Sequence, residues 1–430
     1  MTKSFSIVIV GGGLVGFTLA HAIAIACPTL RIAIIEPKPP VPSANKHANP
    51  HHADTTNNLD RETTHLPAQK DFDRRAIALS LSSLRILQAL LIAPFEAAQA
   101  TPIHTIHISE QGRFGKTTLA ANDYQLLSFG SVIPMSVLHA RIEQNCRQHP
   151  AINFFQPNTL QALSENELGW DCQLDQGAGS ISTELLIGCD GSQSAVRQLL
   201  GITATTRSQE QVAVLANITT EKPLQNTAFE RFTRSGPVAL LPIAAAQATA
   251  VITTDPEHAD ALLQDAECFK QELQSRFGFR LGRILTVGQR QQHPLVRQWA
   301  NQIVARNALL MGNAAHTLHP IAAQGFNLSL RDVAVFVELL AAAASQPLAW
   351  SGLLDRYQAL REPDSKWVKD FTERLLSCFS IDLLPLRILR GLGLQILNTV
   401  PLLKETVVYR GMGLQDTGSQ RLIYGQGWHE

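Results

Sequence analysis

The stretch FSIVIVGGGLVG, residues 5–16, decides the fold that we expect for this chain. Its first half is a short apolar run rich in β-branched residues, which is typical of a buried parallel strand. Gly11, Gly13 and Gly16 then satisfy G-x-G-x-x-G, and residues 14–27 continue as an alanine-rich segment that predicts a helix. The first glycine permits a tight turn, the second lets the backbone approach a pyrophosphate, and the third allows close helix–strand packing.

An acidic residue completes the pattern. A second strand is expected over residues 31–35, and Glu36 ends it, 20 residues after Gly16. A carboxylate in this place accepts hydrogen bonds from a ribose diol, while the helix N-terminus presents free N–H groups to phosphates. The unit therefore predicts a dinucleotide site, because a glycine-rich turn without a ligand leaves Glu36 unexplained. The pattern alone does not separate FAD from NAD.

Composition excludes several other classes of protein. The 430 residues include 36 Lys plus Arg and 36 Asp plus Glu, and a balanced charge gives no sign of a nucleic-acid partner. The six cysteines form no C-x-x-C pair, which is typical of free thiols in a reducing compartment, and no metal site is expected. No signal peptide is recognisable, and no uncharged apolar stretch reaches about 18 residues. These features predict a cytoplasmic location.

The rest of the chain gives a coarse outline of structure. Residues 38–70 are rich in Pro, Asn, His, Asp and Thr and are expected to form a solvated insertion. Residues 73–88 have helical character. Repeated short strands over 210–255 predict an antiparallel sheet. The last 60 residues are expected to be apolar helices that pack on the protein or lie on a membrane surface.

Three further segments carry chemical information. LLIGCDGSQSAVR, residues 185–197, is a short strand ending at Asp190 and Gly191, which places a carboxylate and a tight turn at a sheet edge. The other two are FDRRAIALS, residues 72–80, and LMGNAAHTLHPIAAQGFNLSLRD, residues 310–332. Together the three segments resemble motifs of the class A flavoprotein monooxygenases, and within that family they are most similar to the ubiquinone-biosynthesis hydroxylases.

The resemblance implies FAD as the cofactor and NAD(P)H as the electron donor. It implies that Asp190 and Gly191 lie near the pyrophosphate, that Arg75 lies near FAD, and that a Gly-Asp pair holds the ribityl chain. This sequence has Gly312 and Asn313 at that pair, and an amide still forms hydrogen bonds with a hydroxyl. The remaining cofactor-binding residues that the resemblance implies belong to the turn and helix start beside the isoalloxazine ring: Pro320, Gly325 and Asn327.

The resemblance also implies an α/β fold of the para-hydroxybenzoate hydroxylase type. A Rossmann-like FAD-binding domain would carry an inserted, mostly antiparallel substrate domain and a helical C-terminus. The expected FAD-binding parts are residues 1–100, 131–205 and 301–370, and the expected substrate-domain parts are 101–130 and 206–300. Residues 371–430 would form the C-terminal helical region.

The function implied is hydroxylation of the aromatic ring of a polyprenylated phenol in ubiquinone biosynthesis, with O2 as co-substrate and a flavin C4a-hydroperoxide as oxygen donor. Contact with the inner membrane and with other quinone-biosynthesis proteins would follow from such a substrate. A flavin hydroxylase of a soluble aromatic compound and a non-catalytic scaffold of a quinone-synthesis complex remain as alternatives. The sequence assigns no catalytic side chain, ring position or preference between NADH and NADPH.

Overall fold

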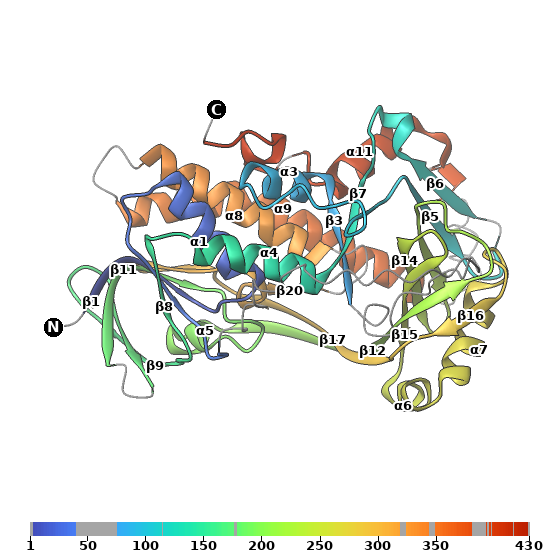
Figure 1. Ribbon diagram of the computed structural model, residues 1–430, viewed down its shortest axis with the longest axis horizontal. Helices are drawn as coiled ribbons and strands as arrows, with labels where there is room; N and C mark the ends of the chain where they lie inside the picture. The colour runs from blue at the N-terminus through green and yellow to red at the C-terminus, as the bar shows by residue number, and fades with distance from the viewer. Residues whose placement is uncertain are drawn as a thin grey trace, which may run out of the picture.

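The fold is described from a computed structural model of the chain. The described residues are 3–39, 75–113, 115–175, 179–318, 324–343, 349–380, 393, 395–396, 398–415 and 417–428. Most of the predicted 38–70 insertion and Pro320 therefore lie outside the described residues. Figure 1 shows two sheets at opposite ends of an elongated molecule, with a helical layer running along one side.

The first sheet has parallel strands at its centre, in the order β19-β11-β1-β2-β8. These strands are β1 (Lys3–Val10), β2 (Ile32–Ile35), β8 (Ile152–Phe155), β11 (Ser180–Gly188) and β19 (Ala308–Leu310). Antiparallel strands β9 (Leu160–Glu165), β10 (Trp170–Leu174) and β18 (Val304–Ala305) extend it. The continuous apolar runs predicted as strands are buried because helices cover the sheet.

Helices form the layer beside this sheet. Helix α1 (Leu14–Ala26) is apolar on nearly every side because it packs between the sheet, α4 (Met135–Arg147) and α8 (Gln324–Ala343). Helix α9 (Trp350–Ser380) packs against α8. The shorter helices are α3 (Leu81–Ala89) and α5 (Ala195–Leu199).

The second sheet is antiparallel except for the pair β13 and β5. Its strands are β5 (Thr105–Glu110), β6 (Lys116–Ala120), β12 (Ala204–Thr220), β13 (Thr227–Thr233), β14 (Gly236–Ala244), β15 (Gln247–Thr254), β16 (Ile284–Val287), β17 (Gln291–Ala300) and β20 (His316–Thr317). Its outer face lies under α6 (Pro256–Gln264) and α7 (Ala266–Phe277). The predicted fold class, an α/β nucleotide-binding part with a mostly antiparallel sheet, is confirmed.

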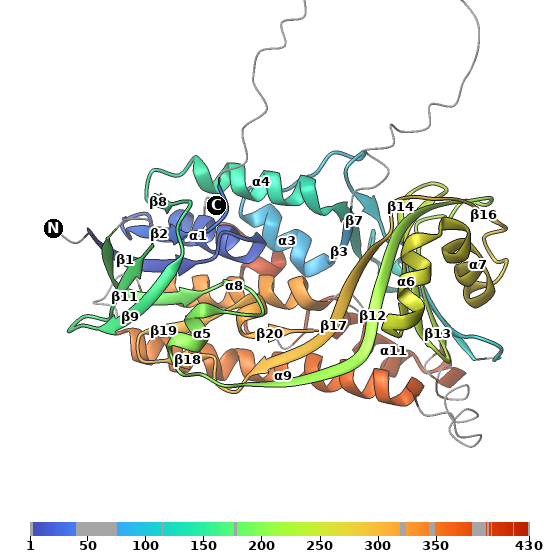
Figure 2. The ribbon, with the colours of Figure 1, turned by 90° about the horizontal axis from the view of Figure 1, so that it is seen from below.

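The long strands β12 and β17 pair with each other and run between the two ends of the molecule (Figure 2). A small sheet of β3 (Ala76–Ser80), β7 (Gly130–Pro134) and β4 (Thr101–Pro102) also lies between the ends. The helix predicted over 73–88 is therefore wrong in its first half. Residues 76–80 form a strand because they pair with β7, and the helix starts only after Ser80, whose side chain caps it.

The C-terminal region is helical in α9 and in α11 (Pro401–Gly411). After residue 411 the described chain follows an irregular path with one 3-10 turn, η4 (Leu422–Tyr424). The carboxylate of Glu338 on α8 fixes this tail by accepting hydrogen bonds from Ser419 and from the backbone N–H of Leu422. The last segment is thus held on the helical layer.

Candidate functional site

The glycine loop between β1 and α1 is built for a ligand. Gly11 has φ +104°, and a Cβ there would lie 2.5 Å from the carbonyl oxygen of Cys189, while a Cβ on Gly16 would lie 1.9 Å from the oxygen of Gly11. Gly13 instead faces open space, and no side chain caps the α1 N-terminus that it begins. The free N–H groups of this helix end therefore point into a space that a phosphate group fits.

Glu36 closes the same loop at the end of β2. Its carboxylate accepts hydrogen bonds from the backbone N–H of Gly12 at 2.6 Å and of Lys38 at 3.1 Å. Each carboxylate oxygen keeps a free lone pair, so Glu36 is positioned and can still accept from a ribose diol.

Asp190 and Gly191 follow β11, which lies beside β1 in parallel, so that both strands end at the same sheet edge. The Asp190 carboxylate accepts from the Ser194 hydroxyl and, at 3.1 Å, from the backbone N–H of Val196. It thereby fixes the start of α5. Gly191 takes φ +88°, which favours glycine.

Gly312 and Asn313 lie on the 3-10 turn η2 (Gly312–Ala314), directly after β19. Because β19 pairs with β11 in parallel, this turn joins the same edge. Gly312 has φ +61° and sits against Val15 of α1. The Asn313 side chain is exposed and has no hydrogen-bond partner among the described residues, so its amide is available to a ligand. We name this edge, formed by the ends of β1, β2, β11 and β19, the cofactor edge.

One arginine that is not among the predicted site residues joins two of these motifs. Arg197 is buried and donates hydrogen bonds to the carbonyl oxygen of Ala314 at 2.9 Å and to that of Ser192 at 2.7 Å. It ties the Asp190 turn to the η2 turn. Its place in a Ser-x-x-Arg run after a strand was the available signal, but its partner lies 117 residues away.

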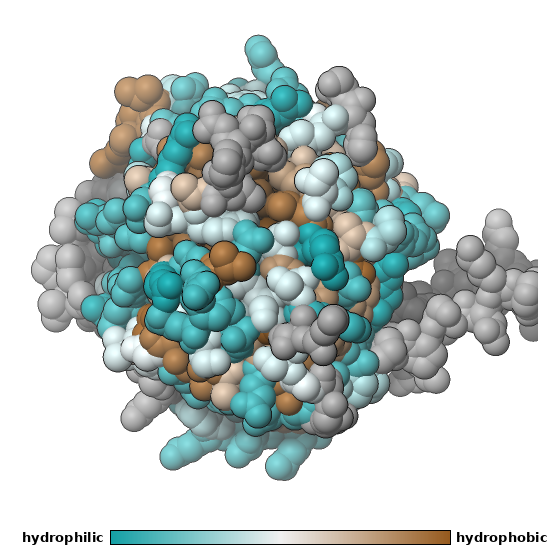
Figure 3. All heavy atoms as spheres, turned by 90° about the vertical axis from the view of Figure 1, so that its left-hand side faces the viewer, coloured by the Kyte–Doolittle hydropathy of each residue, from teal (hydrophilic) through white to brown (hydrophobic). Residues whose placement is uncertain are grey.

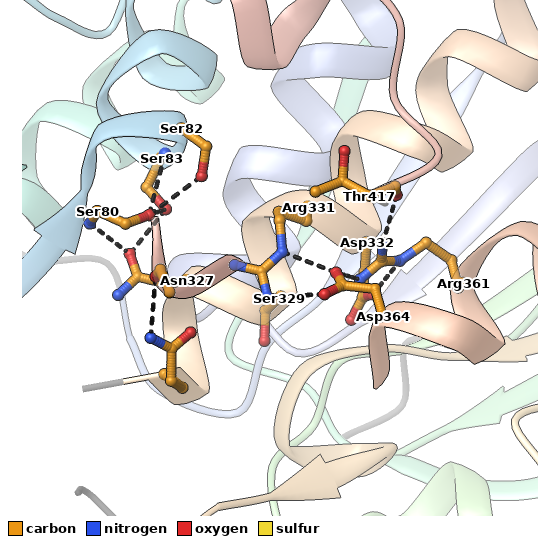
Figure 4. Close-up of polar contacts among 12 residues, drawn as sticks. Ser80, Ser82, Ser83, Asn327, Ser329, Arg331, Asp332, Arg361, Asp364 and Thr417 are labelled. Carbon is orange, nitrogen blue, oxygen red and sulfur yellow. Dashed lines mark hydrogen bonds and ion pairs between the residues drawn. The ribbon is translucent and has the colours of Figure 1, made fainter. Parts of the chain in front are cut away.

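The first turn of α8 approaches the site from the helical layer. Gly325 faces open space, whereas Asn327 is buried and fully engaged (Figure 4). Its Oδ1 accepts from the Ser80 N–H at 2.9 Å and the Ser83 hydroxyl at 2.7 Å, and its Nδ2 donates to the Ala78 oxygen at 3.0 Å. In the structure Asn327 therefore fastens α8 to β3 and α3.

Arg75 lies exposed just before β3 and is close to His293 of the second sheet. Burial and then the charge of Arg75 lower the pKa of His293. The Nε2 atom of His293 is buried without a hydrogen-bond partner among the described residues. Arg75 thus stands where the small sheet meets the second sheet, apart from the glycine loop but free to contact an extended ligand.

A buried network of charges joins α8 to α9 (Figure 4). Its residues were not predicted from the sequence. Arg361 donates to Asp332 at 2.7 Å and to Asp364 at 2.7 Å, while Arg331 donates to Asp364 at 2.8 Å. His316, two residues after the η2 turn, contacts Asp332 at 2.9 Å. The network joins α8, α9 and the segment that follows η2. The Arg-Asp pair at 331–332 and the Arg-x-x-Asp run at 361–364, both within helices, were the signal.

The charges in this network stabilise one another. Burial by itself would raise the pKa of Asp332, but the adjacent Arg361 guanidinium and the hydrogen bond with His316 hold it at about 2. The same opposition of burial and neighbouring arginines lowers the pKa of Asp364. A buried carboxylate kept ionised in this way requires its partners to stay in place.

Comparison with known proteins decides the family. The profile of a family described as "FAD binding domain" matches residues 59–372, which is more than half of the chain. The chain belongs to this FAD-binding family. The predicted family and the FAD cofactor are therefore confirmed. The cofactor edge fits FAD, since it offers an uncapped helix N-terminus, the open space at Gly13, the Glu36 carboxylate and a free Asn313 amide.

Relatives and solved structures match nearly the whole chain. The chain is 30% identical to the ubiquinone hydroxylase UbiL of Rhodospirillum rubrum, covering 98% of this chain and 93% of the relative. It is 29% identical to the 3-demethoxyubiquinol 3-hydroxylase of Escherichia coli, covering 95% and 98%. The p-nitrophenol 4-monooxygenase PnpA of Pseudomonas putida DLL-E4 shares the fold, with a TM-score of 0.74 at 14% identity over 98% of this chain and 100% of that one.

Proposed function

We propose that this protein is an FAD-dependent monooxygenase that hydroxylates the aromatic ring of a polyprenylated phenol in ubiquinone biosynthesis, using NAD(P)H and O2. The observation that carries the proposal is the meeting of the Gly11, Asp190 and Gly312 segments at one sheet edge, in a chain that aligns end to end with quinone hydroxylases. The fold alone does not decide the chemistry, because it also occurs in the flavin-dependent brominase Bmp2.

Within this proposal FAD supplies the transfer of electrons from NAD(P)H to O2 and the activated oxygen. The chain supplies binding and orientation. The α1 N-terminus receives the pyrophosphate, Glu36 accepts from the ribose, and the Asn313 amide contacts the ribityl chain. Arg75 and the α8 start, with Gly325, Asn327 and Pro320, are proposed to flank the ring system, as the sequence resemblance implies. A phenol is already electron-rich, so no triad of catalytic side chains is needed.

A prenylated substrate lives in a membrane, so we further propose peripheral contact of this protein with the inner membrane. Within the described residues, no helix combines the length and apolar content needed to span a bilayer. Exposed apolar residues occur around α11, which lies at the second-sheet end of the molecule: Ile396, Val400, Leu402 and Leu403. The opposite end, shown in Figure 3, mixes hydrophilic and apolar side chains.

The test is reconstitution. Purified protein with its FAD content measured is supplied with NAD(P)H, O2 and a prenylated phenol in detergent or vesicles, and the product is analysed by mass spectrometry. The proposal predicts a hydroxylated prenylphenol. Activity only with a small water-soluble phenol would favour the soluble-aromatic hydroxylase. Colourless protein that oxidises no NAD(P)H would favour the scaffold, and a deletion strain with unchanged ubiquinone would contradict any role in that pathway.

A further inference from the structure

The two faces of the second sheet differ in how completely they are covered. On the outer face, under α6 and α7, the side chains of Val238, Leu240, Ala250 and Ile252 are all 0% exposed. The inner face carries a row of directly paired residues that are only half-buried: Ile108, Glu230, Ala239, Val251 and Leu215. We name this set the inner row. A strand exposes alternate residues to each face, so the inner row faces away from α6 and α7.

Packing on either side of the inner row shows what it faces. Two residues before Glu230 on β13, Ala228 packs with Ala78 and Val132 of the small sheet. In the other direction, Phe232 packs with Leu375 of α9. The inner row therefore lies between two apolar contacts that join the second sheet to the part of the molecule holding the cofactor edge.

Glu230 is an unusual residue to find in this row. The strands β3, β4, β7, β14 and β15 around it contain no ionisable side chain at all. The side chain of Glu230 has no hydrogen-bond or ion-pair partner among the described residues. Glu230 is half-buried, and its strand neighbours Ala228 and Phe232 pack against the small sheet and α9. Burying an unpaired carboxyl is costly, so a structural role does not explain its presence.

A phenol offers the partner that Glu230 lacks. A prenylated ring needs apolar walls, which the inner row supplies, and its hydroxyl needs one polar group. We propose that Glu230 receives the hydroxyl of the phenolic substrate and takes up its proton during hydroxylation. This inference rests on the proposed function and adds a catalytic side chain to it.

The proton transfer balances within the proposed reaction. The phenolic O–H bond breaks, and the electron pair of that bond stays on the substrate oxygen. The proton forms a new O–H bond on the Glu230 carboxylate. That pair increases the electron density of the ring carbon that receives oxygen, while NAD(P)H and O2 supply the electrons and the oxygen atom. The proton passes to water before the next turnover, which restores the carboxylate.

The surroundings of Glu230 favour its role as a base. Burial raises the pKa of Glu230 to about 8. This value is closer than that of an ordinary carboxyl to the pKa of a phenol, about 10, and a closer match makes a more effective base. The rate of hydroxylation should therefore rise as pH increases through about 8, because the carboxylate is the active form.

Other ionisable groups also lie near the inner face. They are Glu110 on β5, His293 and Arg297 on β17, Arg207 on β12, Arg75 before β3, and Glu373 and Arg374 on α9. Burial lowers the pKa of His293, so this residue titrates on the acid side. Arg231 lies on β13 but points to the outer side, where it bonds the Arg276 oxygen.

The test compares Glu230→Gln with Glu257→Gln, a control on exposed helix α6 of the same domain. Both FAD-loaded proteins are assayed for hydroxylated prenylphenol between pH 6.5 and 9. We expect Glu230→Gln to keep its FAD, to lose about 100-fold in kcat and to lose the pH limb near 8, while the control matches the native protein. A Glu230→Gln protein within about threefold of native kcat, with the limb retained, would overturn the inference.

Two further outcomes keep the test decisive. If Glu230→Gln does not fold, Glu230→Asp and the pH profile of the native protein decide, and a native rate that is flat across pH 6.5 to 9 contradicts the inference. If the native protein forms no hydroxylated phenol at all, the proposed function fails and the inference fails with it. A purely structural role for Glu230 would change FAD content or stability without removing the pH limb.

Discussion

The cofactor edge and the inner row of the second sheet recognise their ligands in opposite ways. At the cofactor edge, recognition lies in backbone conformation, and most of its polar side chains already have partners in the protein. The inner row presents apolar side chains and one carboxyl without a partner. A constant cofactor suits a rigid, preformed edge, whereas a lipid-like phenol suits a smooth surface with a single polar contact.

The largest expected effect is in the buried charge network of α8 and α9, which holds the segment that follows η2 next to the cofactor edge. Asp332→Asn leaves the Arg361 and His316 contacts without their carboxylate, and breaking a buried pair costs about 3–5 kcal/mol. The measurement is urea unfolding of the FAD-loaded protein. Glu165→Gln, which breaks the exposed pair with Arg306, is the control and should change stability by less than about 1 kcal/mol. Equal effects of the two substitutions would contradict this account.

A substitution in the glycine loop should have the next largest effect on stability and FAD binding. Gly16→Ala places a Cβ 1.9 Å from the Gly11 oxygen, so the turn must shift, at a cost of about 1–3 kcal/mol and with loss of bound FAD. Gly352→Ala, on an exposed part of α9 with open space around it, is the matched control and should be neutral or stabilising. Flavin absorbance of the purified proteins measures the difference, and full FAD content in Gly16→Ala would refute the assigned role of this loop.

Lowering the pH should reduce the stability that Asp332 contributes to the charge network. The folded-state pKa of Asp332 is about 2, below that of an unfolded aspartate, so its contribution to stability is present above pH 4 and is lost as pH falls through 2. That contribution is about 2 kcal/mol. The gap between the unfolding free energies of the native protein and Asp332→Asn, measured from pH 5 to pH 2, should narrow by about 2 kcal/mol as the pH falls. A gap that stays constant would be inconsistent with an ionised Asp332.

Asn313 gives the smallest expected effect. Asn313→Ala removes an exposed amide, so folding should be unchanged, and FAD affinity should fall by about 0.5–1.5 kcal/mol. Isothermal titration of the FAD-free protein with FAD measures the change, with Asn313→Asp as the comparison that keeps an acceptor. Unaltered affinity in Asn313→Ala would show that the amide does not contact the cofactor.

The sequence predicted the cofactor edge far better than the inner row. Gly11, Gly13, Gly16 and Glu36 are readable because turn geometry and strand ends are local properties. Residues 76–80 were misread as helix because their pairing with β7 is decided some fifty residues away. Arg197 and Arg361 were missed for the same reason, since their partners come from other segments.

Glu230 shows most clearly what could not be predicted from the sequence. In the sequence it is an ordinary acidic residue in a strand, beside an arginine. Only the pairing of five strands places it in an apolar row, and only the tertiary packing of Ala228 and Phe232 brings the small sheet and α9 to either side of it. Pro320 and most of the 38–70 segment stay predictions, because they lie outside the described residues.

The central claim, that this protein inserts oxygen into a prenylated phenol, is tested most directly by isotope labelling. FAD-loaded protein, NAD(P)H, a prenylated phenol and 18O2 are combined, and the product is analysed by mass spectrometry. We predict one 18O atom in the ring hydroxyl formed and one NAD(P)H consumed for each product. NAD(P)H oxidation that yields only hydrogen peroxide, or a product without label, would contradict the claim.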